Sequence, residues 1–198
     1  MTHAAAPYPQ TISDYLALLK DRIAGLDVAG VEEIAAILAR ARETRRHAYV
    51  FGNGGSASVA AHLALGLSYD LSRLGAAPLA ASSLSGGPAI SAIANDRDAS
   101  RVFADQLSVL AKPGDIAIGF SASGSSPNIL CALDWARANT GTAIAVVGTP
   151  GPASRSATMS IILDCSDPAV AEDLFQIISH LLLVAIASTD SHATSTNS

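Results

Sequence analysis

Short apolar runs alternate with stretches of helical periodicity along most of the chain. Five runs have the length of buried strands and cover residues 48–51, 79–82, 116–120, 142–147 and 159–163. The intervening stretches repeat apolar side chains every three or four positions, which predicts helices over residues 56–67, 87–95, 98–110, 127–139 and 168–187. Parallel strands need crossover connections and cover on both faces of the sheet. The pattern therefore predicts an α/β fold with a five-stranded, parallel, doubly wound sheet flanked by helices.

Two further helices are predicted before the first strand, over residues 11–25 and 31–45. They have no sheet of their own, so we expect this N-terminal helical pair to pack on the flank of the sheet or against another subunit. The last predicted helix is apolar nearly all round, which indicates that it is buried. The pattern assigns a flexible N-terminus to residues 1–10, a single domain to residues 11–189 and a polar, disordered tail to residues 190–198.

The composition suits one domain with a large core. Of the 198 residues, 49% are hydrophobic and only 15% are charged, so a second domain is not expected. The mean hydropathy of +0.36 exceeds what a small monomer needs to bury, which favours oligomer interfaces.

The charge pattern excludes some partners. A net charge of −5 and the absence of Lys/Arg runs argue against nucleic acid. The only basic cluster lies at the end of a predicted helix and consists of Arg40, Arg42, Arg45 and Arg46. Such residues more often complement the helix dipole than bind a ligand. Cys131 and Cys165 lack metal-binding spacing, so we expect buried, reduced thiols and a cytoplasmic location. We recognise neither a secretion signal nor an apolar run that approaches membrane-spanning length, and no membrane is expected.

Two small, polar loops carry the candidate chemistry. Phe51-Gly-Asn-Gly-Gly-Ser56 and Ser121-Ala-Ser-Gly-Ser-Ser126 each follow a predicted strand and precede a predicted helix. Backbone N–H groups and Ser hydroxyls at the start of a helix can hold an anion without Lys or Arg. Because carboxyl ends of parallel strands lie at one edge of a sheet, both loops can face one phosphate site. The alternative is two ordinary tight turns with Ser caps.

These loops, together with His62, the Asn95-Asp96 pair and His180 in the last helix, resemble the sugar isomerase (SIS) family, and most of all its phosphoheptose isomerases. The resemblance spans about residues 11–188, with the motifs in order. It implies a five-stranded parallel sheet, a homotetramer with sites at subunit interfaces, and a phosphorylated sugar as ligand. It implies no organic cofactor.

The resemblance also implies roles for individual residues. The substrate-binding set consists of Asn53, Gly54, Gly55, Ser56, Asn95, Asp96, Ser121, Ala122, Ser123, Ser126 and Glu172. From the sequence alone, Asn95 and Asp96 also fit a helix-ending turn. The resemblance implies zinc as a metal cofactor, with His62, Glu172 and His180 as its ligands. His180 and Glu172 are the implied catalytic residues.

The chain departs from the family pattern at several of these positions. Family isomerases have a Glu four residues after the helix histidine, which binds zinc and acts as acid/base, whereas this chain has Gly66. Ala122 replaces a Thr, Ala57 replaces a polar side chain, and Glu172 replaces a Gln. Glu172 is one candidate for the missing base, and Asp70, one turn beyond Gly66, is another, although Asp70 fits equally well as the solvent-exposed end of the helix.

Two functions follow from this reading. The first is an isomerase that interconverts a ketose phosphate such as sedoheptulose 7-phosphate and an aldose phosphate, with His180 and Glu172 in acid/base roles. The second is a non-catalytic tetrameric SIS module that senses a phosphosugar or scaffolds a protein partner, as in the replication-initiator-associated branch of the family. The retention of both histidines favours the isomerase, which is the main prediction, whereas Gly66 favours the non-catalytic module.

Overall fold

The computed structural model describes residue 9 and residues 11–195 and has a single parallel sheet at its centre. The sheet order is β2-β1-β3-β4-β5, and every neighbouring pair is parallel. The strands are β1 (Ala48–Gly52), β2 (Ala81–Ser83), β3 (Ile116–Ser121), β4 (Thr142–Val147) and β5 (Met159–Ile162). This confirms the predicted five-stranded, doubly wound α/β fold.

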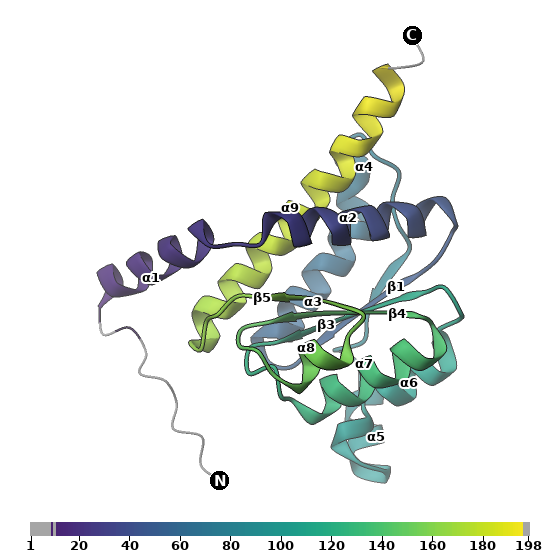
Figure 1. Cartoon of the computed structure of the whole chain (residues 1–198). Helices are drawn as coiled ribbons and strands as arrows, with labels where there is room; N and C mark the ends of the chain where they lie inside the picture. The colour runs from purple at the N-terminus through teal and green to yellow at the C-terminus, as the bar shows by residue number, and fades with distance from the viewer. Residues whose placement is uncertain (1–8, 10, 196–198) are drawn as a thin grey trace.

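Helices cover both faces of this sheet (Figure 1). One face packs against α2 (Val28–Glu43), α3 (Gly55–Leu65) and α9 (Pro168–Ser195), and the other against α5 (Pro88–Asp96), α6 (Ala104–Leu110), α7 (Pro127–Asn139) and α8 (Pro152–Ser156). Successive strand residues alternate between the two cores: Val50 and Ile118 lie in the first, Phe51 and Ala117 in the second. Because both faces are covered, nearly all residues of the central strands are buried.

The first helix, α1 (Ile12–Ala24), extends away from the rest of the molecule (Figure 1). The Thr11 side chain caps it by accepting a hydrogen bond from the backbone N–H of Asp14. None of its residues is buried. The Tyr15 hydroxyl donates to Asp173 on α9 over 2.6 Å, and Arg22 pairs with Asp164 at 3.3 Å. These polar contacts, together with the partly buried Leu18 and Leu19 that pack against the core, hold α1 to the domain.

Several boundaries differ from the prediction. The helix after β1 does not stop near residue 67: α3 continues through a π-helical turn (Gly66–Asp70) into α4 (Leu71–Arg73). The segment 98–110 divides into a 3-10 turn (Ala99–Arg101) and α6. The connection between β4 and β5, in which no helix was predicted, contains the short helix α8, which starts with Pro152 in its first turn.

The C-terminal helix is longer and more apolar than expected. It runs to Ser195, past the predicted domain end at residue 189, while residues 196–198 and all but one of residues 1–10 lie outside the described chain. The statement that no apolar run approaches membrane-spanning length is wrong, since Pro168–Thr189 has 22 residues and a mean hydropathy of 1.7. Half of that window is buried inside the fold, as expected for a core helix.

Candidate functional site

The two polar loops meet where the strand order reverses. From β1 the chain moves outward to β2, whereas from β3 it moves the other way to β4, so the switch point lies between β1 and β3. Asn53, after β1, and Asn128, in the first turn of α7, form a reciprocal amide pair: each side-chain NH2 donates to the other's carbonyl oxygen, over 2.9 and 2.8 Å. The predicted convergence of the loops is therefore present, joined by Asn128, a residue that the sequence did not single out.

The loop of residues 121–126, here called the serine loop, presents neutral donors at the start of α7. The hydroxyls of Ser121 and Ser126 lie 3.2 Å apart, and the Ser123 hydroxyl accepts from the backbone N–H of Ser125 at 3.3 Å. Gly124 has φ 63° and lies so close to the Thr149 carbonyl that a Cβ would overlap it. Ala122 participates through its backbone, its carbonyl accepting from the Thr149 N–H. The loop is thus compact and lies at the positive end of a 13-residue helix, a position that can hold an anion.

The loop after β1 already holds a carboxylate. Glu172 Oε1 accepts from the backbone N–H of Ser56 at 3.0 Å and lies 3.4 Å from the Ser56 hydroxyl. A Cβ on Gly55 would overlap this carboxylate, and Gly54 has φ 55°, which explains the two glycines. Glu172 therefore caps the N-terminus of α3. The two loops do not offer equivalent anion sites, because the protein's own charge occupies the first.

A stripe of polar side chains on α9 faces α3. It consists of Glu172, Gln176 and His180, spaced four residues apart. His180 Nε2 lies 2.9 Å from His62 Nε2 on α3 and 3.2 Å from Gln176 Nε2. The Gln176 amide nitrogen can only donate, so in that contact His180 Nε2 is the acceptor, and the contact with His62 Nε2 involves the same nitrogen. The sequence reading missed Gln176, although its position midway between Glu172 and His180 was the available signal.

A third loop also reaches this edge of the sheet and was not predicted. Ser85, after β2, accepts a hydrogen bond from the Gly52 N–H at 2.9 Å and donates to the Gly52 carbonyl at 3.0 Å. It thereby fixes the end of β1 just before Asn53. The Ser-Gly-Gly sequence at residues 85–87, after a predicted strand, was the available signal.

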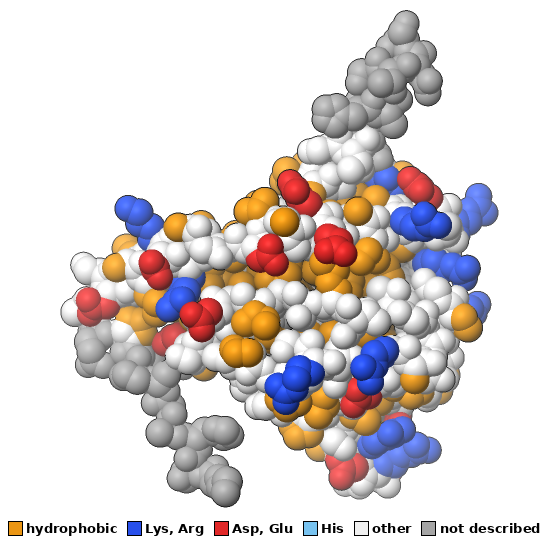
Figure 2. Space-filling view, in the orientation of Figure 1, with side chains coloured by type: hydrophobic (Ala, Val, Ile, Leu, Met, Phe, Trp, Pro, Cys, Tyr) orange, Lys and Arg blue, Asp and Glu red, His pale blue; other side chains and the backbone are white. Residues whose placement is uncertain are grey.

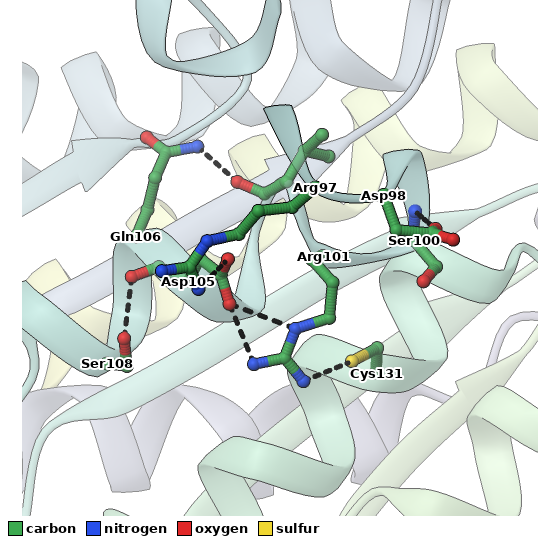
Figure 3. Close-up of polar contacts among 9 residues, drawn as sticks. Arg97, Asp98, Ser100, Arg101, Asp105, Gln106, Ser108 and Cys131 are labelled. Carbon is green, nitrogen blue, oxygen red and sulfur yellow. Dashed lines mark hydrogen bonds and ion pairs between the residues drawn. The ribbon is translucent and has the colours of Figure 1, made fainter. Parts of the chain in front are cut away.

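Asn95 and Asp96 lie apart from this hydrogen-bonded network. Both are exposed at the end of α5, and the Asn95 side chain donates to Asp96 over 2.8 Å. The adjoining segment is fastened by Arg97 and Arg101, which converge on Asp105 (Figure 3). No side-chain hydrogen bond in the described chain joins the Asn95-Asp96 pair to the two loops, so its substrate contact stays a prediction.

Figure 3 also shows Arg101 reaching Cys131 on α7, at 3.6 Å from the sulfur. Cys131 is half-buried rather than buried as predicted, whereas Cys165 is buried. Both thiols are free.

Comparison with known proteins places this chain in a family. The family model described as SIS domain matches residues 13–148. The chain belongs to the SIS domain family. Phosphoheptose isomerase of Trichlorobacter lovleyi is 36% identical over 174 residues, covering 86% of this chain and 87% of that protein. Phosphoheptose isomerase of Solidesulfovibrio magneticus is 37% identical over 134 residues, covering 66% of this chain and 64% of that protein.

A solved structure supports the SIS fold. The phosphoheptose isomerase from Francisella tularensis superposes with a TM-score of 0.79 at 24% identity, covering 89% of this chain and 94% of that chain. This likeness bears on the arrangement of the sheet and helices that carry the loops.

The zinc ligands implied by the SIS resemblance are not assembled within one chain. His62 and His180 are in contact, but the Glu172 carboxylate is bonded to Ser56 at the start of α3. In the described part of the chain, no group of three or more His, Cys, Asp or Glu side chains could hold a metal ion. Two imidazoles do not complete a structural or catalytic zinc site, so zinc stays a prediction.

At position 66, where SIS isomerases have a Glu, the space beside Gly66 is filled by a side chain of α9. Gly66 is buried, and a Cβ there would lie 2.6 Å from Leu183 Cδ1 on α9. Asp70, one of the two proposed substitutes, pairs with Arg73 at 3.2 Å in the π-helical and α4 segment. Of the two candidates, Glu172 is therefore the one that the structure places beside the polar loops.

Proposed function

We propose that this chain is an aldose–ketose isomerase that acts on sedoheptulose 7-phosphate. The name phosphoheptose isomerase, carried by its relatives at 36 and 37% identity, supports this substrate class. The observation that carries the proposal is the Asn53–Asn128 pair, which joins the two polar loops at the switch point of the sheet. Glu172 adjoins one of these loops and belongs to the polar stripe on α9.

The phosphate fits the serine loop. Its hydroxyls and the N-terminus of α7 supply neutral donors, whereas the N-terminus of α3 is occupied by Glu172. A phosphate dianion beside that carboxylate would be repelled. The ligand therefore lies with its phosphate at residues 121–126 and its carbonyl end toward Glu172.

The proposed chemistry is proton transfer through an enediol. A base takes a proton from the carbon next to the carbonyl, and an acid protonates the carbonyl oxygen. Glu172 is the proposed base, since Oε1 is held by Ser56 while Oε2 lies over Gly55. His180 is the proposed acid/base at oxygen, and Gln176 positions its imidazole.

Deuterium exchange tests this function directly. Sedoheptulose 7-phosphate is incubated with purified protein in D2O, with and without added zinc, and exchange at carbon is followed by NMR. We expect exchange by the wild type, none by His180→Gln, and a raised KM with little change in kcat for Ser126→Ala. Ser108→Ala, an exposed serine on α6, is the matched control. Thermal stabilisation by the sugar phosphate without exchange would overturn the isomerase and favour the phosphosugar-sensing module.

We further propose a homotetramer located in the cytoplasm. An apolar groove of 510 Å³ between α2 and α9 is lined by Val28, Val31, Leu181 and Val184 among others, and α1 exposes Ile12 and Leu16. Exposed apolar surface of this kind promotes aggregation of a monomer, whereas it suits a subunit interface. Light scattering after gel filtration measures the assembly, and metal analysis of the same fractions measures bound zinc.

A further inference from the structure

Two adjoining cavities lie at the amino ends of the strands, opposite the edge that carries the polar loops. The larger, of 430 Å³, lies between the end of α2 and the starts of β3 and β4. The smaller, of 240 Å³, lies beside the start of β1. Arg46 lines both cavities, so they adjoin at its side chain, whose guanidinium donates to the Pro113 carbonyl over 3.1 Å; together they are here called the amino-edge cleft.

This amino-edge cleft is strongly cationic. Arg40 lines the larger cavity, and Arg45 and Lys112 line the smaller. In the part of the chain that the structure describes, neither they nor Arg46 form an ion pair with an acidic side chain. Figure 2 shows Lys and Arg side chains gathered at the right of the view, where the carboxyl end of α2 lies. A chain of net charge −5 thus concentrates four cations in one cleft.

The one carboxylate that lines the cleft is already bonded. Asp115 is buried, and its two oxygens accept the backbone N–H groups of His47 at 2.9 Å and Lys112 at 2.8 Å. Its pairing is with the backbone, so the four cationic groups keep a net charge of +3 in its presence.

Complementing the dipole of α2 does not account for this cluster. Arg40 lies in the last turn of the helix, but Arg45 and Arg46 follow its end, and Lys112 comes from the segment before β3. The hydroxyl of Thr44 already donates to the Arg40 carbonyl over 2.8 Å. Arg45 has φ 54° because it is the left-handed residue that ends α2: its N–H donates to the Arg42 carbonyl and the Arg46 N–H donates to the Ala41 carbonyl. This helix-ending conformation favours Gly or Asn, so it does not explain a cationic side chain at this position.

We propose that this cleft binds an organic diphosphate, such as a nucleoside diphosphate. A guanidinium group can donate two parallel hydrogen bonds to the oxygens of one phosphate. Because Arg40 lines one cavity, Arg45 and Lys112 line the other, and Arg46 lines both, the cations suit two linked phosphates better than one. The larger cavity also has apolar walls from Ile37, Ala41 and Ile116, with hydroxyls from Thr44 and Thr142. These accommodate an uncharged organic group beyond the phosphates.

Calorimetric titration tests the proposal with four ligands: ADP, inorganic pyrophosphate, inorganic phosphate and sedoheptulose 7-phosphate. We expect ADP and pyrophosphate to bind at least ~10-fold more tightly than phosphate, and their affinity to fall with added salt. Arg46→Gln and Lys112→Gln should each weaken ADP binding about 10-fold. Arg137→Gln, in a surface pair with Asp134 on α7, is the matched control and should leave it unchanged.

The Arg45→Gly variant distinguishes a loss of ADP binding from a loss of folding stability. Gly relieves the left-handed strain, so this variant should be at least as thermally stable as the wild type while binding ADP more weakly. Equal affinity for phosphate and pyrophosphate, displacement of ADP by sedoheptulose 7-phosphate, or unchanged ADP binding in the Arg46 and Lys112 variants would each overturn the proposal. So would tighter binding to an oligonucleotide or to anionic lipid vesicles than to ADP.

Discussion

At the scale of single residues, Gly55 and Glu172 form an interdependent pair. Replacing Gly55 with Ala places a methyl group in the volume of the Glu172 carboxylate, and we expect a loss of about 1–3 kcal/mol in the free energy of unfolding. Glu172→Ala leaves the N–H of Ser56 without its cap and should cost about 1 kcal/mol. In the double variant the overlap is absent, so its loss should be smaller than the sum by about 1 kcal/mol.

Urea unfolding of the wild type and the three variants measures this coupling. Gly141→Ala is unsuitable as a control because Gly141 has φ 89°, whereas Gly25 has a negative φ and only ordinary contacts around a built Cβ. Gly25→Ala therefore serves as the control and should show no coupling to Glu172→Ala. Strict additivity of Gly55→Ala and Glu172→Ala would mean that the carboxylate does not occupy the start of α3.

Restoring the family carboxylate at position 66 needs room that α9 does not leave. We expect Gly66→Glu alone to cost about 1–3 kcal/mol in unfolding free energy, because its Cβ meets Leu183 Cδ1. Leu183→Ala opens a cavity and should cost about 2–5 kcal/mol alone. In the combined variant the glutamate occupies that space, so we expect a gain in exchange rate for the sugar phosphate over both single variants.

Unfolding midpoints and deuterium exchange in the three variants check this. If Gly66→Glu alone were as stable as the wild type and equally active, the packing at this position would not be what excludes the carboxylate.

The residue scale also shows where sequence reasoning stops. Gly54 and Gly55 were found because they lie between a predicted strand and a predicted helix, where backbone N–H groups can hold an anion, and the serine loop was found for the same reason. Asn128 and Gln176 were missed because an amide on a helix gains meaning only from its partner, and Asn53 and His180 are brought to them by the fold. The position of Glu172 at the start of α3 likewise depends on how α3 and α9 pack.

At the scale of elements, α1 is held by polar contacts to Asp173 and Asp164 and by Leu18 and Leu19, which pack against the core. Burial and then the bond to Asp173 raise the pKa of Tyr15, so its hydroxyl stays protonated as donor across the neutral range. Tyr15→Phe removes this donor and should cost about 1–2 kcal/mol of local stability. We expect faster hydrogen exchange confined to α1, whereas Tyr69→Phe, on an exposed side chain, should leave it unchanged. Equal protection of α1 in the wild type and the Tyr15 variant would contradict this.

The elements were predictable wherever the apolar period was regular. The strands β3 and β4 and helix α7 match their predicted ranges almost residue for residue. The π-helical turn at Gly66–Asp70 was not foreseen because a one-residue change of register leaves the apolar pattern of α3 nearly intact. Helix α8 was missed because its Gly and Pro neighbours are equally typical of a loop.

At the scale of the whole molecule, the apolar groove between α2 and α9 is the surface at which we expect subunits to associate. Val28 and Val184 are exposed by 58% and 57% in the single chain, and the groove they line is apolar. A charge buried in such an interface without a partner is strongly unfavourable. We expect Val28→Lys combined with Val184→Lys to convert the proposed tetramer into smaller species with a lower melting temperature. Val109→Lys, on α6 at 82% exposure, is the control and should keep the wild-type mass.

Light scattering distinguishes the species, and an unchanged mass in the double variant would place the subunit interface elsewhere. Since the SIS resemblance implies sites shared between subunits, isomerase activity should fall together with the tetramer.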